Sequence, residues 1–176
     1  MTSKGFSDRV ERWLARIPGV RTYRDREHRR ETDNRLREHL ASRLQEARTG
    51  LLRTTLEMSK KGQFGPLVEV DRLSSRMQQM SDTIRYASYG YAGIFDIEKI
   101  REEELDHLYT FDLSLMDDLE EIQSKVAELG TQNPSEKWNA AIEEAFHLLE
   151  ALEKKFRQRN EFLARPAGPS EKTRVH

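Results

Sequence analysis

Apolar residues recur along most of the chain at alternating spacings of three and four, the pattern of helices that bury one face. Three segments show it: Val70, Leu73, Met77, Met80, Ile84, Ala87 and Tyr91; Leu105, Leu108, Asp112, Leu115, Leu119, Ile122, Val126 and Leu129; and Trp138, Ile142, Ala145, Leu149, Leu152, Phe156 and Leu163. An earlier stripe consists of Leu36, Leu40, Leu44, Ala47, Leu51 and Met58. We therefore expect an all-α protein with coiled-coil-like packing.

Turn signals divide this pattern into four long helices. The first is expected over roughly residues 23–61, and turns are expected at 62–66, 89–95 and 130–133. The last helix begins in residues 133–136, where Asn, Pro and Glu suit a capped start. Because short turns favour antiparallel neighbours, the simplest architecture is an up-down antiparallel bundle. The first helix is the longest, so it must overhang or bend.

A shorter amphipathic helix is expected ahead of the bundle, which divides the chain into residues 1–19, a bundle domain over 20–163 and a disordered tail over 164–176. The apolar side of this segment carries Phe6, Val10, Trp13, Leu14 and Ile17. Basic residues occupy its other sides, so two interpretations stand. The segment packs on the bundle as a lid, or it lies on an anionic membrane surface.

The composition excludes several classes of protein. Only 36% of residues are hydrophobic while 35% are charged, which favours long solvated helices over a sheet buried on both faces. The chain has no cysteine, which excludes disulfides, a thiolate nucleophile and Cys-ligated metal sites. No apolar run is long enough for a membrane span, and no secretory leader is recognisable. We therefore expect a cytoplasmic protein, with a peripheral membrane location as the alternative.

Charge is distributed unevenly along the chain. Residues 1–61 carry an excess of Lys and Arg, and residues 96–129 an excess of Asp and Glu. Residues 23–34 contain no aliphatic side chain, so i,i+4 ion pairs must hold this stretch of the first helix. We expect it to form a charged overhang that binds a protein partner through Arg29 and Arg30.

The second expected partner surface is the aromatic connection between the second and third helices. Its candidate contact residues are Tyr89, Tyr91 and Phe95. Stacking on a nucleic acid is disfavoured, because the acidic residues that follow would repel phosphate.

Asp112 occupies a position of the third stripe where an apolar residue is expected. A buried carboxylate requires hydrogen bonds or a cation, so a partner is implied. Arg85 on the second helix, or an arginine of the first helix, could supply it. We interpret Asp112 as a structural polar residue that sets the register of the helices. Arg159 interrupts the stripe of the last helix in a similar way.

Two Glu-x-x-His elements form the one enzymatic lead. Glu104 with His107, and Glu144 with His147, have the spacing found in carboxylate-bridged di-iron bundles. Helical geometry directs His107 to the rim and His147 away from the core, which argues against inward metal ligands. The common nucleotide-binding, hydrolase and metalloprotease motifs do not occur.

The chain resembles a family of small helical bacterial proteins over roughly residues 6–129. The segments that carry the resemblance are residues 23–33, 85–96 and 104–112. The recurring positions within these segments are Asp33, Gly90, Gly93, Phe95, Asp96 and Asp112. No activity is established for the family, so the resemblance implies neither catalytic residues nor a cofactor.

These patterns favour a non-enzymatic helical-bundle protein that acts through protein partners or through self-association into a homo-oligomer. The first alternative is binding to a membrane surface through the amphipathic start of the chain. The second alternative is a bundle that binds metal through carboxylates and histidines. We expect no catalytic residues and no cofactor.

Overall fold

The computed structural model describes residues 10, 12–13, 17, 26–62, 64–65, 67–87, 97, 100–131 and 136–164. The elements are η1 (Arg26–His28), α2 (Arg29–Lys60), α3 (Leu67–Tyr86), η3 (Glu102–Glu104), α4 (Leu105–Thr131) and α5 (Glu136–Leu163). Helices are the only regular elements over these residues, which confirms the expected all-α class.

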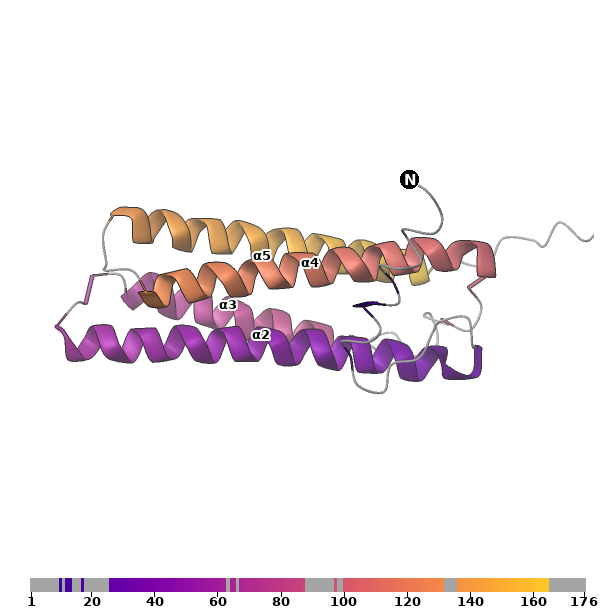
Figure 1. Ribbon diagram of the computed structural model, residues 1–176, viewed down its shortest axis with the longest axis horizontal. Helices are drawn as coiled ribbons and strands as arrows, with labels where there is room; N and C mark the ends of the chain where they lie inside the picture. Colours follow the sequence, from indigo (N-terminus) through magenta and orange to yellow (C-terminus); the bar gives the residue numbers. More distant parts are fainter. Residues whose placement is uncertain are drawn as a thin grey trace, which may run out of the picture.

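The four long helices form two hairpins that lie side by side (Figure 1). Helices α2 and α3 run antiparallel, as do α4 and α5, while α2 and α4 run in the same direction. The main contacts join α2 to α3, α4 to α5, α2 to α4 and, less extensively, α3 to α5. Each helix therefore has one antiparallel and one parallel neighbour. The simplest up-down layout, in which all neighbours are antiparallel, is not confirmed.

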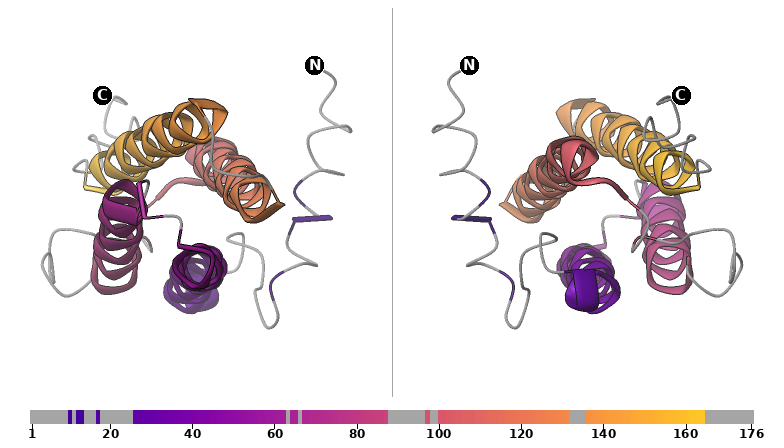
Figure 2. Two further views of the ribbon diagram at one scale, coloured as in Figure 1. Left: turned by 90° about the vertical axis from the view of Figure 1, so that its left-hand side faces the viewer. Right: turned by 90° about the vertical axis from the view of Figure 1, so that its right-hand side faces the viewer.

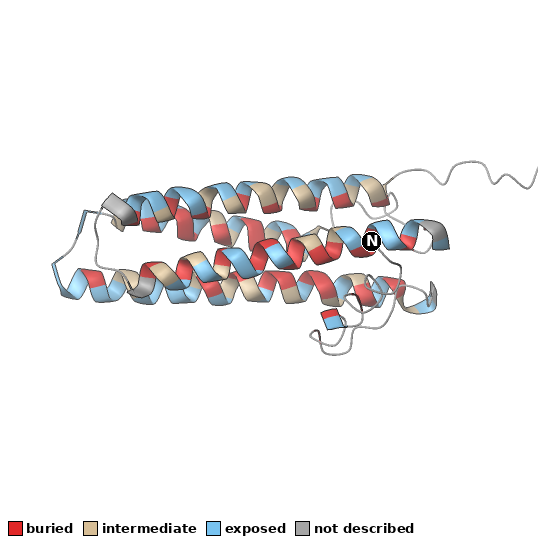
Figure 3. Cartoon of the chain, turned by 45° about the horizontal axis from the view of Figure 1, so that its top comes forward, coloured by how far each residue is buried: buried red, intermediate tan, exposed pale blue. Residues whose placement is uncertain are grey.

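The predicted apolar stripes form the core. Every described residue of the four stripes is buried, apart from the half-buried Ala87. The inward faces of the helices are correspondingly red in Figure 3. Trp138 is fully buried and donates a hydrogen bond from Nε1 to the carbonyl of Leu129 at 3.0 Å. This bond joins the end of α4 to the beginning of α5.

Helix α2 is much longer than α3, with 32 residues against 20. Gly62 follows its C-cap with φ at 72°, a backbone conformation that glycine adopts without strain. Beyond the C-terminus of α3, Ile97 and Ile100 are buried in the same core. Arg29, the first residue of α2, donates a hydrogen bond to the carbonyl of Ile100. The start of α2 is therefore attached to the chain that precedes α4, and the expected free overhang is wrong there.

Three of the five apolar residues expected on the amphipathic start of the chain are buried. Val10, Trp13 and Ile17 all belong to the core, and the Trp13 ring meets Tyr109 of α4 edge-on, with 6.3 Å between centroids. Figure 2 shows the described parts of this segment beside α4. This burial favours the lid interpretation and gives no support to lipid contact. Phe6 and Leu14 lie outside the described residues.

The ends of the chain are described only in part. Of the expected tail, Ala164 is described, and its N–H donates to the carbonyl of Asn160 at 3.0 Å, while residues 165–176 lie outside the described residues. None of the described helices contains a segment with the length and hydrophobicity of a membrane span.

Replacing Trp13 by Ala tests whether this segment packs on the bundle. Loss of a buried aromatic side chain is expected to lower the free energy of unfolding by about 3–5 kcal/mol. Chemical denaturation of the full chain measures the change. Arg12→Ala is the control, because Arg12 is exposed and adjacent in sequence. Equal stability of the two variants would show that Trp13 does not pack against α4.

Candidate functional site

The most unusual group of side chains is a set of charges inside the core. Asp112 of α4 is fully buried, as the sequence predicts, and it accepts a hydrogen bond from Nε of Arg159 at 2.5 Å. Arg159 lies near the end of α5 and is 1% exposed. Burial of either charge alone would be very unfavourable, because a low-dielectric interior does not replace its hydration. The pair therefore holds α4 and α5 in register.

Helix α2 joins this pair through a second carboxylate. Arg159 Nη2 lies 2.7 Å from Oδ1 of Asp33, and Oδ2 of Asp33 accepts a hydrogen bond from Arg37 Nε at 2.9 Å. Arg37 also donates from Nη1 to the carbonyl of Arg85 at the end of α3, at 3.2 Å. We call Asp33, Arg37, Asp112 and Arg159 the Arg159 cluster. It connects all four long helices.

The electrostatics of the Arg159 cluster are balanced. It contains two carboxylates and two guanidinium groups, so its net charge is zero. Burial alone would raise the pKa of Asp33, but the adjacent guanidinium groups of Arg159 and Arg37 lower it below its usual value. Asp33 and Asp112 lie towards the N-termini of α2 and α4, and Arg159 lies towards the C-terminus of α5. These positions lie more than one turn from the helix ends, where the helix dipole contributes little, so the ion pairs themselves stabilise the buried charges.

The arrangement of these charges corrects the expected partner of Asp112. Arg85 contributes only its backbone carbonyl to the cluster, whereas Arg159 supplies the cation. The sequence contained a signal that could have identified Arg159 as the partner of Asp112. Asp112 and Arg159 are the polar interruptions of two neighbouring stripes, and they lie at similar distances from the α4–α5 connection. Opposite charges at matching positions of a helical hairpin face each other.

The prediction that Arg29 and Arg30 form a basic docking surface is wrong for Arg29. Arg29 is fully buried and donates from Nη1 to the carbonyl of Ile100 at 2.7 Å, so it is an internal group. Its guanidinium satisfies the backbone of the segment that precedes α4, which the sequence pattern did not indicate. Arg30 is exposed, as expected. The aromatic candidates Tyr89, Tyr91 and Phe95 lie outside the described residues.

The ion pairs expected along the first helix are confirmed at two positions. Arg35 lies 2.7 Å from Glu31 on the exposed side of α2, and Arg37 pairs with Asp33 inside the Arg159 cluster. The first pair is solvated and contributes little to stability, whereas the second is buried. Buried polar contacts therefore hold the aliphatic-free part of α2.

The four metal candidates do not come together. Glu104, His107, Glu144 and His147 are all exposed. The first pair lies where η3 passes into α4, and the second lies in the first half of the antiparallel helix α5 (Figure 1). Glu144 pairs with Lys125 at 3.1 Å, and this hydrogen bond raises the pKa of Lys125. No group of three potential metal ligands occurs in the described part of the chain. The geometry gives no support to a di-metal site.

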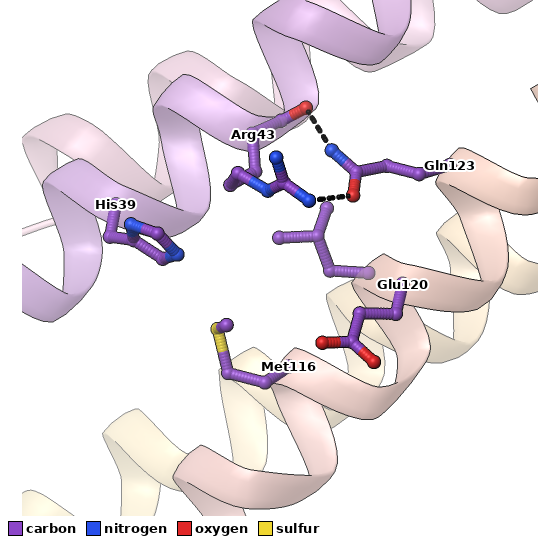
Figure 4. A pocket seen from close by; sticks show the side chains of 6 residues that line it. His39, Arg43, Met116, Glu120 and Gln123 are labelled. Carbon is purple, nitrogen blue, oxygen red and sulfur yellow. Dashed lines mark hydrogen bonds between the residues drawn. The ribbon is translucent and has the colours of Figure 1, made fainter. Parts of the chain in front are cut away.

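A shallow hollow of about 340 Å³ lies between α2 and α4 (Figure 4). Arg43 and Gln123 bridge it with two hydrogen bonds, from Arg43 Nη2 to Gln123 Oε1 at 2.7 Å and from Gln123 Nε2 to the Arg43 carbonyl at 3.0 Å. His39 also lines the hollow, and partial burial together with the charge of Arg43 lowers its pKa. The Arg43 and Gln123 side chains therefore link α2 to α4 across the hollow.

Large apolar side chains are exposed where α2 passes into α3. Val68 is 73% exposed, Phe64 63%, Leu56 55% and Leu52 39%. The same end of the hairpin is mostly pale blue in Figure 3. We call these four residues the hairpin-end patch. The sequence analysis did not single them out, because their spacing does not stand out beside the longer core stripes.

Helical geometry places the hairpin-end patch on one outer face. Gln45 marks the edge of α2 that meets α3, because it donates to Gln78 at 2.9 Å. Leu52 lies two turns further along that edge, and Leu56 lies on its outward side. On α3, Gln78 marks the edge that meets α2, and Val68 lies on the solvent side of that edge. The core stripes of both helices lie on the opposite side, so the exposed apolar residues face solvent together.

Comparison with known proteins returned no match: no family model fits the chain, and no curated protein or solved structure is similar to it. The resemblance to small helical bacterial proteins therefore stays a prediction. The candidate site is defined by geometry alone, as a buried structural cluster and an exposed apolar patch at opposite ends of the molecule.

Replacing Arg159 by Met tests the energetic role of the cluster. The change leaves Asp112 buried without its cation, and we expect the free energy of unfolding to fall by about 3–5 kcal/mol. The double variant Asp112→Leu/Arg159→Met should recover most of this loss, because it removes both members of this buried pair and leaves Asp33 paired with Arg37. Denaturant titration measures the variants.

The control for this test is the same exchange at an exposed ion pair. Arg35→Met breaks the pair with Glu31 and should cost less than about 1 kcal/mol. If Arg159→Met proves no more destabilising than Arg35→Met, the buried cluster does not hold the helices together.

The lowered pKa of Asp33 predicts a specific dependence of stability on pH. Its value in the unfolded chain is near 3.8, and its folded value is lower. The stabilisation by ionised Asp33 is therefore complete above pH 3.8 and is lost as the pH falls through the folded pKa. The difference in unfolding free energy between the wild-type chain and Asp33→Asn should shrink over that range. A difference that is constant from neutral pH to well below pH 3.8 would contradict the assignment.

Proposed function

We propose that the protein is a non-enzymatic helical interaction protein that binds protein partners through the hairpin-end patch. The observation that carries this proposal is the concentration of exposed Leu52, Leu56, Phe64 and Val68 at one end of the α2–α3 hairpin. Clustered exposed apolar side chains are characteristic of interaction surfaces, whereas single ones are ordinary.

The different character of the two ends of the molecule supports this proposal. The buried charges of the Arg159 cluster pair with one another, so their chemistry is used to fix the helices. That cluster lies at the end where α2 and α4 begin, and the hairpin-end patch lies at the end where α2 stops (Figure 1). A rigid helical support that presents an apolar tip fits an adaptor or scaffold role. The proposed setting is the cytoplasm, as expected from the sequence.

The experiment compares partner capture by two matched variants of the full chain. Leu56→Glu/Val68→Glu places charges on the hairpin-end patch. Thr49→Glu/Ser75→Glu places the same charges two helical turns away on the same faces of α2 and α3. Each variant is used to copurify partners from the native cells, with quantitative mass spectrometry. We expect the patch variant to lose proteins that the control variant retains.

Equal unfolding curves for the two variants, within about 0.5 kcal/mol, establish that both remain folded. Arg30→Glu, measured in parallel, tests the exposed part of the basic surface expected from the sequence. If the patch variant captures the same partners as the control, the hairpin-end patch is not the interaction surface.

A further inference from the structure

The charges around the hairpin-end patch differ between its two helices. The exposed residues Arg53 and Lys60 lie next to the apolar side chains of α2, and the exposed residues Glu69 and Asp71 lie near Val68 on α3. With the exposed Glu57 and Lys61 included, the end of α2 carries a net charge of +2, and with the exposed Arg72 included, the start of α3 carries a net charge of -1. The α2 border is therefore basic on balance, and the α3 border is acidic on balance.

The nearest partners of these charges are local and exposed. Lys60 pairs with Glu57 at 2.8 Å, and Glu69 lies 3.8 Å from Arg72 on the next turn of α3. Both pairs are solvated, so exchanging them for contacts with another molecule costs little. Arg53 and Asp71 form no ion pair among the residues that the structure describes, and both are accessible to a partner.

From this layout we infer that the hairpin-end patch joins two copies of the chain, an inference that rests on the proposed function and names its partner. A two-fold axis parallel to the helices brings α2 of one copy against α3 of the other. The basic border of each copy then faces the acidic border of its partner, and the apolar residues meet between them. A partner of a single charge sign would complement only one of the two helices.

The expected association is weak and depends on concentration, because four apolar side chains with a charged border make a small interface. Sedimentation equilibrium of the full chain over about a hundredfold range of concentration should show the mass rising from 20.7 kDa towards that of a dimer. Leu56→Glu/Val68→Glu should remain monomeric over the same range, while Thr49→Glu/Ser75→Glu should associate like the wild-type chain.

Charge reversal tests the arrangement of the two copies. Arg53→Glu/Lys60→Glu makes both borders acidic, and Glu69→Lys/Asp71→Lys makes both borders basic. Each variant alone should be monomeric, because like charges then face each other across the two-fold axis. An equimolar mixture should form dimers, because every border of one variant meets the opposite charge on the other. Circular dichroism establishes that both variants keep their helices.

Two results would overturn the inference: a wild-type chain that stays monomeric throughout, or a mixture that is no heavier than its separate components. Failure here is distinguishable from failure of the proposed function. A monomeric wild-type chain whose patch variant still loses copurified proteins would leave the interaction role in place with a different partner. A monomeric chain whose patch variant captures every partner would remove both.

Discussion

The arrangement of the helices depends on how one buried cation is neutralised. Arg159 has almost no exposed surface, and it contacts Asp112 of α4 and Asp33 of α2 at 2.5 and 2.7 Å. A guanidinium group in this environment requires a carboxylate at short range, because the interior does not replace water. Asp112 supplies one on α4, and Asp33, which also pairs with Arg37, extends the contact to α2. The two hairpins must therefore lie side by side in the alignment that brings the three residues together. Helices α2 and α4 run in the same direction because both are antiparallel to α3 (Figure 1), and the contacts of Arg159 join these two helices through α5.

Most of the core could be predicted from the sequence, because burial in a helix repeats with the helical period. The stripes from Val70 to Ile84 and from Leu105 to Leu129 are buried as their spacing predicts. Periodicity also placed Asp112 inside the core. The spacing within one helix does not select its partner, and the signal for Arg159 came from comparing two helices, because Arg159 is the polar interruption of the neighbouring stripe.

The order of the helices around the core was predicted less well for the same reason. Short turns fix the direction of consecutive helices, but they do not determine which hairpin faces are in contact. Arg29 illustrates the limit. Its sequence neighbourhood is wholly polar and indicated solvent, yet it is buried beneath the α3–α4 connection, where it bonds the carbonyl of Ile100. The environment of Arg29 thus includes a contact with a residue far away in the sequence, which local spacing does not reveal.

The two ends of the molecule differ in the side chains that they bury and expose. The end that contains the Arg159 cluster is closed by internal ion pairs and by buried residues such as Trp13 and Ile100. The other end leaves Phe64 and Val68 open to solvent. Among the described residues, four of the five large exposed apolar side chains lie at this second end, and the fifth, Tyr86, lies at the end of α3 near the Arg159 cluster.

The most direct test measures whether the buried charges impose a single alignment. The chain has no cysteine, so introduced cysteines are labelled specifically. We place spin labels at Ser42→Cys on α2 and Ser124→Cys on α4, both of which are exposed positions. Pulsed electron paramagnetic resonance should give one narrow distance when the Arg159 cluster is intact. It should give a broadened or divided distribution in the helical variant Asp112→Leu/Arg159→Met. The same narrow distance in both proteins would contradict the account, because apolar packing alone would then determine the alignment.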